Sequence, residues 1–129
     1  MKDENKDKPL ARIAGLMGVD TMETHLFLCV GPDCCTEEEG MTAWQALKKA
    51  HKARFSNLKE ARIYRTKVGC LRICKEGPIA VAYPQGKWFR GVTPEKMEDL
   101  LDYLDKGAEE PHPLEFTQHP LPHNPSGKD

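Results

Sequence analysis

The chain has 129 residues, with 19 basic and 20 acidic side chains and a formal net charge of −1. This length is enough for one domain with a modest core. The balanced charge gives no general attraction to nucleic acid or to an anionic membrane. No early apolar run is long enough for a signal peptide or a membrane span. We therefore expect a cytoplasmic protein that binds no nucleic acid and inserts into no membrane.

Composition divides the chain into three parts. Residues 1–23 begin with the charged lead-in "MKDENKDKPL" and are expected to form a flexible N-terminal arm. Residues 24–107 carry the periodic apolar patterns and form the predicted domain. Residues 108–129 are rich in Pro and His and are expected to run as an extended tail, because proline opposes regular structure. The histidines of this tail are expected to be solvated: His112, His119 and His123.

The first half of the domain predicts a strand, a helix and a second strand. The run "THLFLCV" (24–30) is mostly apolar and is typical of a strand buried on both faces. In 41–54, Trp44 and Leu47 stand at helical spacing, with Lys and Arg on the opposite side, which indicates an amphipathic helix. Residues 61–68, "ARIYRTKV", alternate as a second strand does.

The second half predicts a hairpin and a closing helix. The runs "IAVAYP" (79–84) and "KWFRG" (87–91) flank the turn residues Gln85-Gly86. The helix over 94–105 has Pro94 at its first position, after the capping residue Thr93. The order is β-α-β and then β-β-α, which is the plan of the thioredoxin fold. We expect an α/β protein with a four-stranded mixed sheet flanked by helices, and a cis peptide bond at Gly77-Pro78.

Five cysteines fall into two groups, "FLCVGPDCC" and "KVGCLRIC". Four residues separate Cys29 from Cys34, thirty-five separate Cys34 from Cys70, and three separate Cys70 from Cys74. In a reducing compartment such thiols bind metal or do redox chemistry rather than form disulfides. A thioredoxin-type redox couple would need a C-x-x-C motif, which is absent. Structural zinc and an iron–sulfur cluster both accept four thiolates. A [2Fe–2S] cluster requires two pairs from two loops, as here.

The residues resemble a known family, the thioredoxin-like [2Fe–2S] ferredoxins, which are related to an iron–sulfur subunit of respiratory complex I and of NAD-linked hydrogenases. The resemblance rests on the cysteine spacing, "CVGPDC", "GCLRIC", "GPIAVAYPQGKWF" and "VTPEKMEDLLDYL", and covers residues 24–107. It implies a [2Fe–2S] cluster. By resemblance the ligands are Cys29, Cys34, Cys70 and Cys74, and Cys35 is the alternative to Cys34. The short first loop is closer to the complex I type, whereas the N-terminal arm is shorter than in that subunit.

The resemblance also implies the function. We expect a one-electron carrier between larger redox proteins, and not an enzyme. The alternatives are an iron–sulfur subunit of an NAD(P)H dehydrogenase or hydrogenase complex, and a structural zinc-binding interaction module. Members of the family tend to form homodimers, so Trp88 and Phe89 on the hairpin are candidate interface residues. Arg72 and Lys75 lie beside the ligands, where basic groups favour a reduced cluster.

Overall fold

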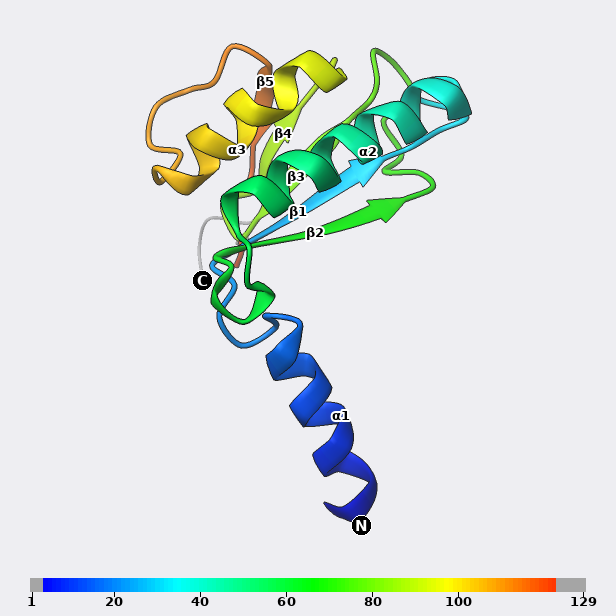
Figure 1. Cartoon of the computed structure of the whole chain (residues 1–129). Helices are drawn as coiled ribbons and strands as arrows, with labels where there is room; N and C mark the ends of the chain where they lie inside the picture. The colour runs from blue at the N-terminus through cyan, green and yellow to red at the C-terminus, as the bar shows by residue number, and fades with distance from the viewer. Residues whose placement is uncertain (1–3, 123–129) are drawn as a thin grey trace.

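The computed structural model describes residues 4–122; residues 1–3 and 123–129, including His123, lie outside it. Figure 1 shows the arrangement of the helices and strands along the chain. The helices are α1 (Glu4–Leu16), α2 (Glu37–Arg54) and α3 (Met97–Asp105), with the short 3-10 helices η1 (Leu58–Glu60) and η2 (Pro94–Lys96). The strands are β1 (Thr24–Cys29), β2 (Ile63–Val68), β3 (Ala80–Tyr83), β4 (Lys87–Phe89) and β5 (Glu115–Gln118).

Within residues 4–122 the strands form one mixed sheet in the order β2-β1-β3-β4-β5. β1 and β2 are parallel, whereas each of the other pairs of neighbours is antiparallel. The predicted order, β-α-β and then β-β-α, is confirmed. The sheet has five strands instead of the expected four, because a segment of the tail pairs with β4. The Gly77-Pro78 peptide bond is cis, as predicted.

α2 begins four residues earlier than its apolar periodicity indicates. The Thr36 hydroxyl accepts a hydrogen bond from the Glu39 N–H at 3.0 Å, and the Glu39 carboxylate accepts one from the Thr36 N–H at 2.9 Å. This reciprocal pair is a capping box, which satisfies N–H groups that the helix itself cannot. Glu37, Glu38 and Glu39 in the first turn also favour the helix dipole. Capping, rather than core packing, therefore determines where α2 starts.

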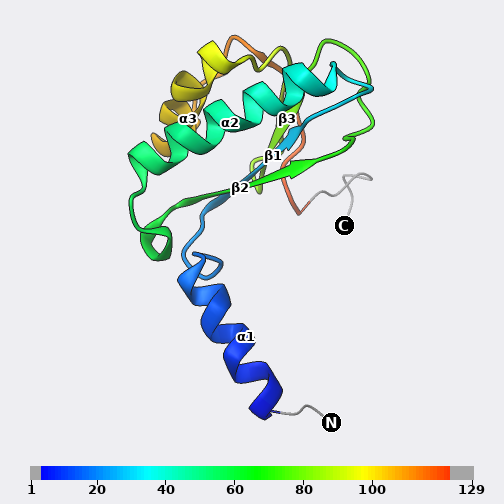
Figure 2. The same cartoon turned by 45° about the vertical axis from the view of Figure 1, so that its right-hand side comes forward.

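α2 and α3 lie side by side on one face of the sheet, as Figure 1 and Figure 2 both show. β1 accordingly alternates: Leu26 and Leu28 are fully buried, whereas His25 and Phe27 are only half-buried. The expectation that this strand is buried on both faces is wrong, because helices cover only one face. The largest fully buried side chains of this core include Phe89, Leu26, Leu28, Leu47, Leu100 and Leu101.

The segment expected to be a flexible arm contains α1, which projects away from the sheet in Figure 1 and Figure 2. Its nearest neighbour in the domain is η1. Leu10, Ile13 and Leu16 remain exposed, at 66%, 53% and 46%. The core therefore gives this helix little support. The helix relies instead on residues with good helix propensity, such as Leu and Ala.

The tail returns to the sheet after α3. Glu115 pairs with Phe89 and Thr117 with Trp88 across β4 and β5. His112 is buried, and its Nε2 lies 2.8 Å from the Asp99 carboxylate. The expectation that His112 is solvated is therefore wrong. Prolines exclude helix from this tail, but they leave an edge strand free to form between them.

Candidate metal centre

The two loops that carry the cysteines leave the same end of the sheet. β1 ends at Cys29, which lies opposite Val68, the last residue of its parallel neighbour β2. The carboxyl ends of parallel neighbours meet at one edge, so the chains that follow them are adjacent. We call residues 30–36 the first cysteine loop and residues 69–79 the second. The Cys29 Sγ lies 3.7 Å from the Gly69 carbonyl oxygen, which joins the two loops at their start.

Cys29 and Cys34 form the buried half of the site. They are 1% and 7% exposed, and their Sγ atoms are in contact as a disulfide pair. A disulfide is not expected of thiols in a reducing compartment. The two Cα atoms are 7.1 Å apart, which is wider than ordinary disulfides allow. This separation suits two thiolates that converge on one metal ion.

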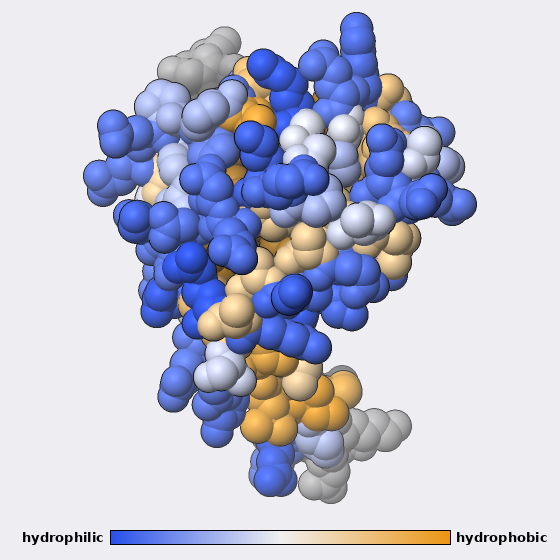
Figure 3. Space-filling model, turned by 45° about the horizontal axis from the view of Figure 1, so that its top comes forward, coloured by the Kyte–Doolittle hydropathy of each residue, from blue (hydrophilic) through white to orange (hydrophobic). Residues whose placement is uncertain are grey.

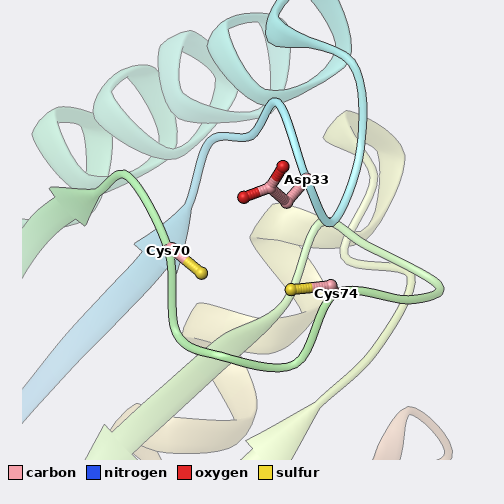
Figure 4. Close-up of side chains that lie close together, drawn as sticks. All are labelled: Asp33, Cys70 and Cys74. Atoms are coloured by element: carbon pink, nitrogen blue, oxygen red, sulfur yellow. The ribbon is translucent and has the colours of Figure 1, made fainter.

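Cys70 and Cys74 form the exposed half of the site, in the second cysteine loop. Figure 4 shows their sulfur atoms near the Asp33 side chain of the first loop. The Sγ atoms and a carboxylate oxygen of Asp33 all lie within 4.8 Å of one another. The Arg72 N–H donates a hydrogen bond to the Cys70 Sγ at 3.2 Å, and Arg72 has a positive φ of 73° that curls the loop. The loop thus turns both thiols toward the same point.

The chemistry of this donor set fits a cation. Desolvation raises the pKa of Cys74, and a hydrogen bond with Cys70 and the negative charge of Asp33 raise it further, while Arg72 acts against them. Two adjacent thiols and a carboxylate resist joint ionisation because like charges repel. A bound metal cation removes this penalty and deprotonates its thiol ligands. Thiolate pairs are the ligands of soft metals and of iron–sulfur clusters.

Cys35 also lies beside the site. Its Sγ is 3.7 Å from the Cys34 Sγ, and its side chain is half-buried. Burial raises the pKa of Cys35, and the charge of Glu39 adds to this effect. In a strand, adjacent residues point in opposite directions, and only one of the two sulfur atoms would face the site. The first cysteine loop is not extended at this point, so both sulfur atoms stay close to each other.

Glycines allow the two loops to approach each other. The Gly77 N–H donates to the Cys34 carbonyl at 2.9 Å, and a Cβ on Gly77 would lie 2.5 Å from that oxygen. Gly31 has φ +88°, and a Cβ there would lie 2.4 Å from the Cys35 carbonyl oxygen. These contacts are with backbone atoms, which cannot move aside. The sequence therefore needs glycine at both positions.

The residue that the cysteine spacing does not reveal is Asp33. It stands in "GPDCC", immediately before a candidate ligand, and this position was the only available signal.

Trp88 and Phe89 were expected at a dimer interface. Phe89 is fully buried in the core, so that expectation is wrong for Phe89. Trp88 is half-buried and packs against the small cluster formed by Cys29, Cys34 and Ile79. Trp88 therefore helps to cover the buried half of the site.

The comparisons with known proteins agree with the cysteine pattern. No family model matches the chain. A protein described as "Ferredoxin, 2Fe-2S" from Aquifex aeolicus (strain VF5) is 28% identical over 90 residues, which are 66% of this chain and 81% of that protein. Another described in the same words, from Clostridium pasteurianum, is 44% identical over 40 residues, which are 30% of this chain and 39% of that protein. The solved structure of a thioredoxin-like [2Fe–2S] ferredoxin from Aquifex aeolicus has a TM-score of 0.64 at 25% identity and covers 78% of this chain and 96% of that chain.

The sheet order and these neighbours define an α/β protein with a thioredoxin-like fold and a cysteine centre at the end of its sheet. In sequence and in fold the chain is similar to thioredoxin-like [2Fe–2S] ferredoxins. These relatives are ferredoxins, which are electron-transfer proteins rather than catalysts. Among residues 4–122, no helix is long and apolar enough to cross a membrane.

Proposed function

We propose that this chain holds a [2Fe–2S] cluster and carries single electrons between larger redox proteins. The observation that carries this proposal is the meeting of the two cysteine loops at the carboxyl ends of the parallel strands β1 and β2. The proposed ligands are Cys29, Cys34, Cys70 and Cys74, with Cys35 as the alternative to Cys34. The ferredoxin relatives support the choice of cluster over zinc.

The protein's residues divide the work around such a cluster. When bound, the cluster supplies the one-electron chemistry. Cys29 and Cys34 anchor it against the small apolar cluster that includes Ile79 and Trp88. Cys70 and Cys74 hold the side that is open to solvent. We infer that redox partners dock over this open side, because electron transfer needs a short path to the protein surface.

The location and assembly of the protein are part of the same proposal. We infer a cytoplasmic homodimer, on the basis of the family resemblance and of cysteines suited to a reducing compartment. The domain limits are proposed as an N-terminal segment 1–23, a ferredoxin domain 24–107 and a tail 108–129.

One observation favours the second candidate, an iron–sulfur subunit of an NAD(P)H dehydrogenase or hydrogenase complex. Figure 3 shows hydrophobic side chains gathered at the projecting end of the molecule. The exposed apolar residues of this region are Leu10, Ile13, Leu16, Met17 and Val19. Apolar surface of this kind marks interaction sites. Sedimentation velocity of the purified chain separates the candidates: a stable carrier stays a discrete dimer, whereas an orphan subunit aggregates without its complex.

The test of the proposed function is an anaerobic purification, followed by visible and EPR spectra before and after dithionite. We expect a red-brown protein with iron and acid-labile sulfide in equal amounts, EPR-silent as purified and with a signal from one unpaired electron after reduction. A colourless protein without a reduced-state signal would refute the proposal. Zinc without iron or sulfide would support a structural zinc module instead.

A further inference from the structure

Asp33 places a carboxylate on the exposed half of the candidate centre. Its oxygen lies within 4.8 Å of the Sγ atoms of both Cys70 and Cys74, although it belongs to the other cysteine loop. Figure 4 shows its side chain beside the two sulfur atoms. Asp33, Cys70 and Cys74 are all exposed. The carboxylate is thus next to the side of the site through which we expect electrons to pass.

No ion pair neutralises this carboxylate within the part of the chain that the structure describes. Arg90, in the segment after β4, forms its ion pair with Glu76 instead, at 3.7 Å. Arg72 is the basic residue whose charge acts on Cys74 against that of Asp33. Asp33 and Arg72 therefore act on the exposed cysteine pair with charges of opposite sign, one from each loop.

We propose that Asp33 lowers the reduction potential of the site by holding a negative charge against the exposed cysteine pair. This inference rests on the proposed function. By formal charges, four thiolates and the oxidised cluster sum to −2, and one electron from a stronger reductant takes the sum to −3 without forming or breaking a bond. A negative charge a few ångströms away disfavours that added electron, as Coulomb's law requires. Net charge near a cluster is one of the factors that set its potential.

The direction of the effect has a functional consequence. By opposing reduction, Asp33 makes the reduced protein a stronger donor toward its acceptor. Arg72 acts in the other direction through its charge and through its N–H, which donates to the Cys70 Sγ. The potential is then the balance of two charges carried by two loops, and each can be changed separately.

The experiment compares four reconstituted proteins by EPR-monitored titration with dithionite and mediators. In Asp33→Asn, which keeps the shape and removes the charge, we expect the equilibrium constant for reduction to rise about tenfold, or 59 mV for one electron. Asp33→Glu keeps the charge and should stay close to wild type. Glu38→Gln removes one charge from the exposed first turn of α2 and is the matched control. It should leave the potential unchanged.

The outcomes separate this inference from the proposed function. A potential of Asp33→Asn equal to that of wild type, or an equal shift in Glu38→Gln, overturns the role of Asp33. So does an altered visible spectrum in Asp33→Asn, since that would make Asp33 a ligand. A wild-type chain that takes up no cluster refutes the proposed function itself, before any potential is compared. As an independent check, Arg72→Gln should shift the potential downward, opposite to Asp33→Asn.

Discussion

Cys34 and Cys35 are neighbours whose sulfur atoms lie 3.7 Å apart, yet their surroundings differ. Cys34 is 7% exposed, belongs to the small apolar cluster with Cys29 and is tied by its carbonyl to the Gly77 N–H. Cys35 is half-buried, and burial, together with the charge of Glu39, raises the pKa of its thiol. We therefore propose the anchored residue, Cys34, as the ligand, because its sulfur is held in one place before a metal arrives.

Serine substitutions test this assignment. We expect Cys34→Ser to lose or strongly alter the cluster spectrum after reconstitution, since a serine oxygen is a poor substitute for a thiolate. Cys35→Ser should keep the wild-type visible and EPR spectra. The matched control is the wild-type chain reconstituted in parallel with the same iron and sulfide. The opposite pattern would make Cys35 the ligand and leave the ferredoxin proposal intact.

The spacing of the cysteines predicts which residues belong to the site, but not which way each side chain points. The three spacings between the four candidate ligands are properties of the chain and can be read directly. The close approach of Cys35 to Cys34 depends on a loop that is not extended, and that of Asp33 to Cys70 depends on two loops meeting in space. Neither arrangement has a period that a sequence pattern could reveal.

At the scale of elements, His51 connects α2 to β2. Its Nε2–H donates to the Ile63 carbonyl at 2.6 Å, and its side chain is 2% exposed. Burial lowers the pKa of His51 and the charge of Arg65 lowers it further, although the bond to Ile63 acts the other way. The folded protein therefore keeps this imidazole neutral at a pH where the unfolded chain protonates it.

This shift predicts acid sensitivity. As the pH falls through 6.5, the ordinary pKa of histidine, the unfolded chain binds a proton that the folded chain refuses, so stability falls. The slope is at most about 1.4 kcal/mol per pH unit for one such group. Urea unfolding from pH 7.5 to 5 should show a smaller loss in His51→Gln than in wild type. Lys52→Gln changes an exposed residue next to His51 in the last turn of α2 and is the control, which should keep the pH slope of wild type. Equal pH slopes in His51→Gln and wild type would contradict the assignment.

The tail is held on the sheet by a buried ion pair between β4 and β5. The Lys87 Nζ lies 3.2 Å from the Glu115 carboxylate, and the two side chains are 5% and 11% exposed. Desolvation acts to lower the pKa of Lys87, but hydrogen bonds with Tyr103 and Glu115 outweigh it and raise the pKa above 10.5. Stability from this pair is thus present at neutral pH and is lost only as the pH rises through that raised value.

Removing one partner of this pair should be costly. In Lys87→Met the Glu115 carboxylate stays buried without its cation, and we expect a loss of about 3 kcal/mol in the free energy of unfolding. Lys106→Met is the control, because the Lys106–Asp102 pair is exposed and such pairs contribute about 0.5 kcal/mol. Chemical denaturation at pH 7 measures both. Similar losses in the two variants would show that the tail is not held by Lys87.

At the scale of the whole molecule, the core and the candidate centre are separate. The main core lies between the sheet and the two helices α2 and α3, and includes Leu26, Leu47 and Leu101. The centre has its own small cluster of Cys29, Cys34 and Ile79 at the end of the sheet. The large core should support the fold by itself, whereas the two cysteine loops depend on what they bind.

Removal of the cluster tests this separation. A ligand that binds only the folded state stabilises it by mass action, so the cluster-free chain, kept reduced, should melt at a lower temperature than the loaded one. Its far-UV circular dichroism should nevertheless remain close to that of the loaded protein. A cluster-free chain with the spectrum of a random coil would mean that the centre, and not the core, drives folding.

Local sequence determined the order of the strands and helices, because each depends on apolar periodicity, caps and turn residues that are adjacent in the chain. It also predicts that the two cysteine loops leave the same edge of the sheet, since parallel strands joined by a helix must end there. Tertiary structure alone decided that β5 forms, that His112 and Lys87 are buried, and that Asp33 faces Cys70 and Cys74. Each of these features joins segments far apart in the chain. Their burial and charge arise only when the folded core brings those segments together.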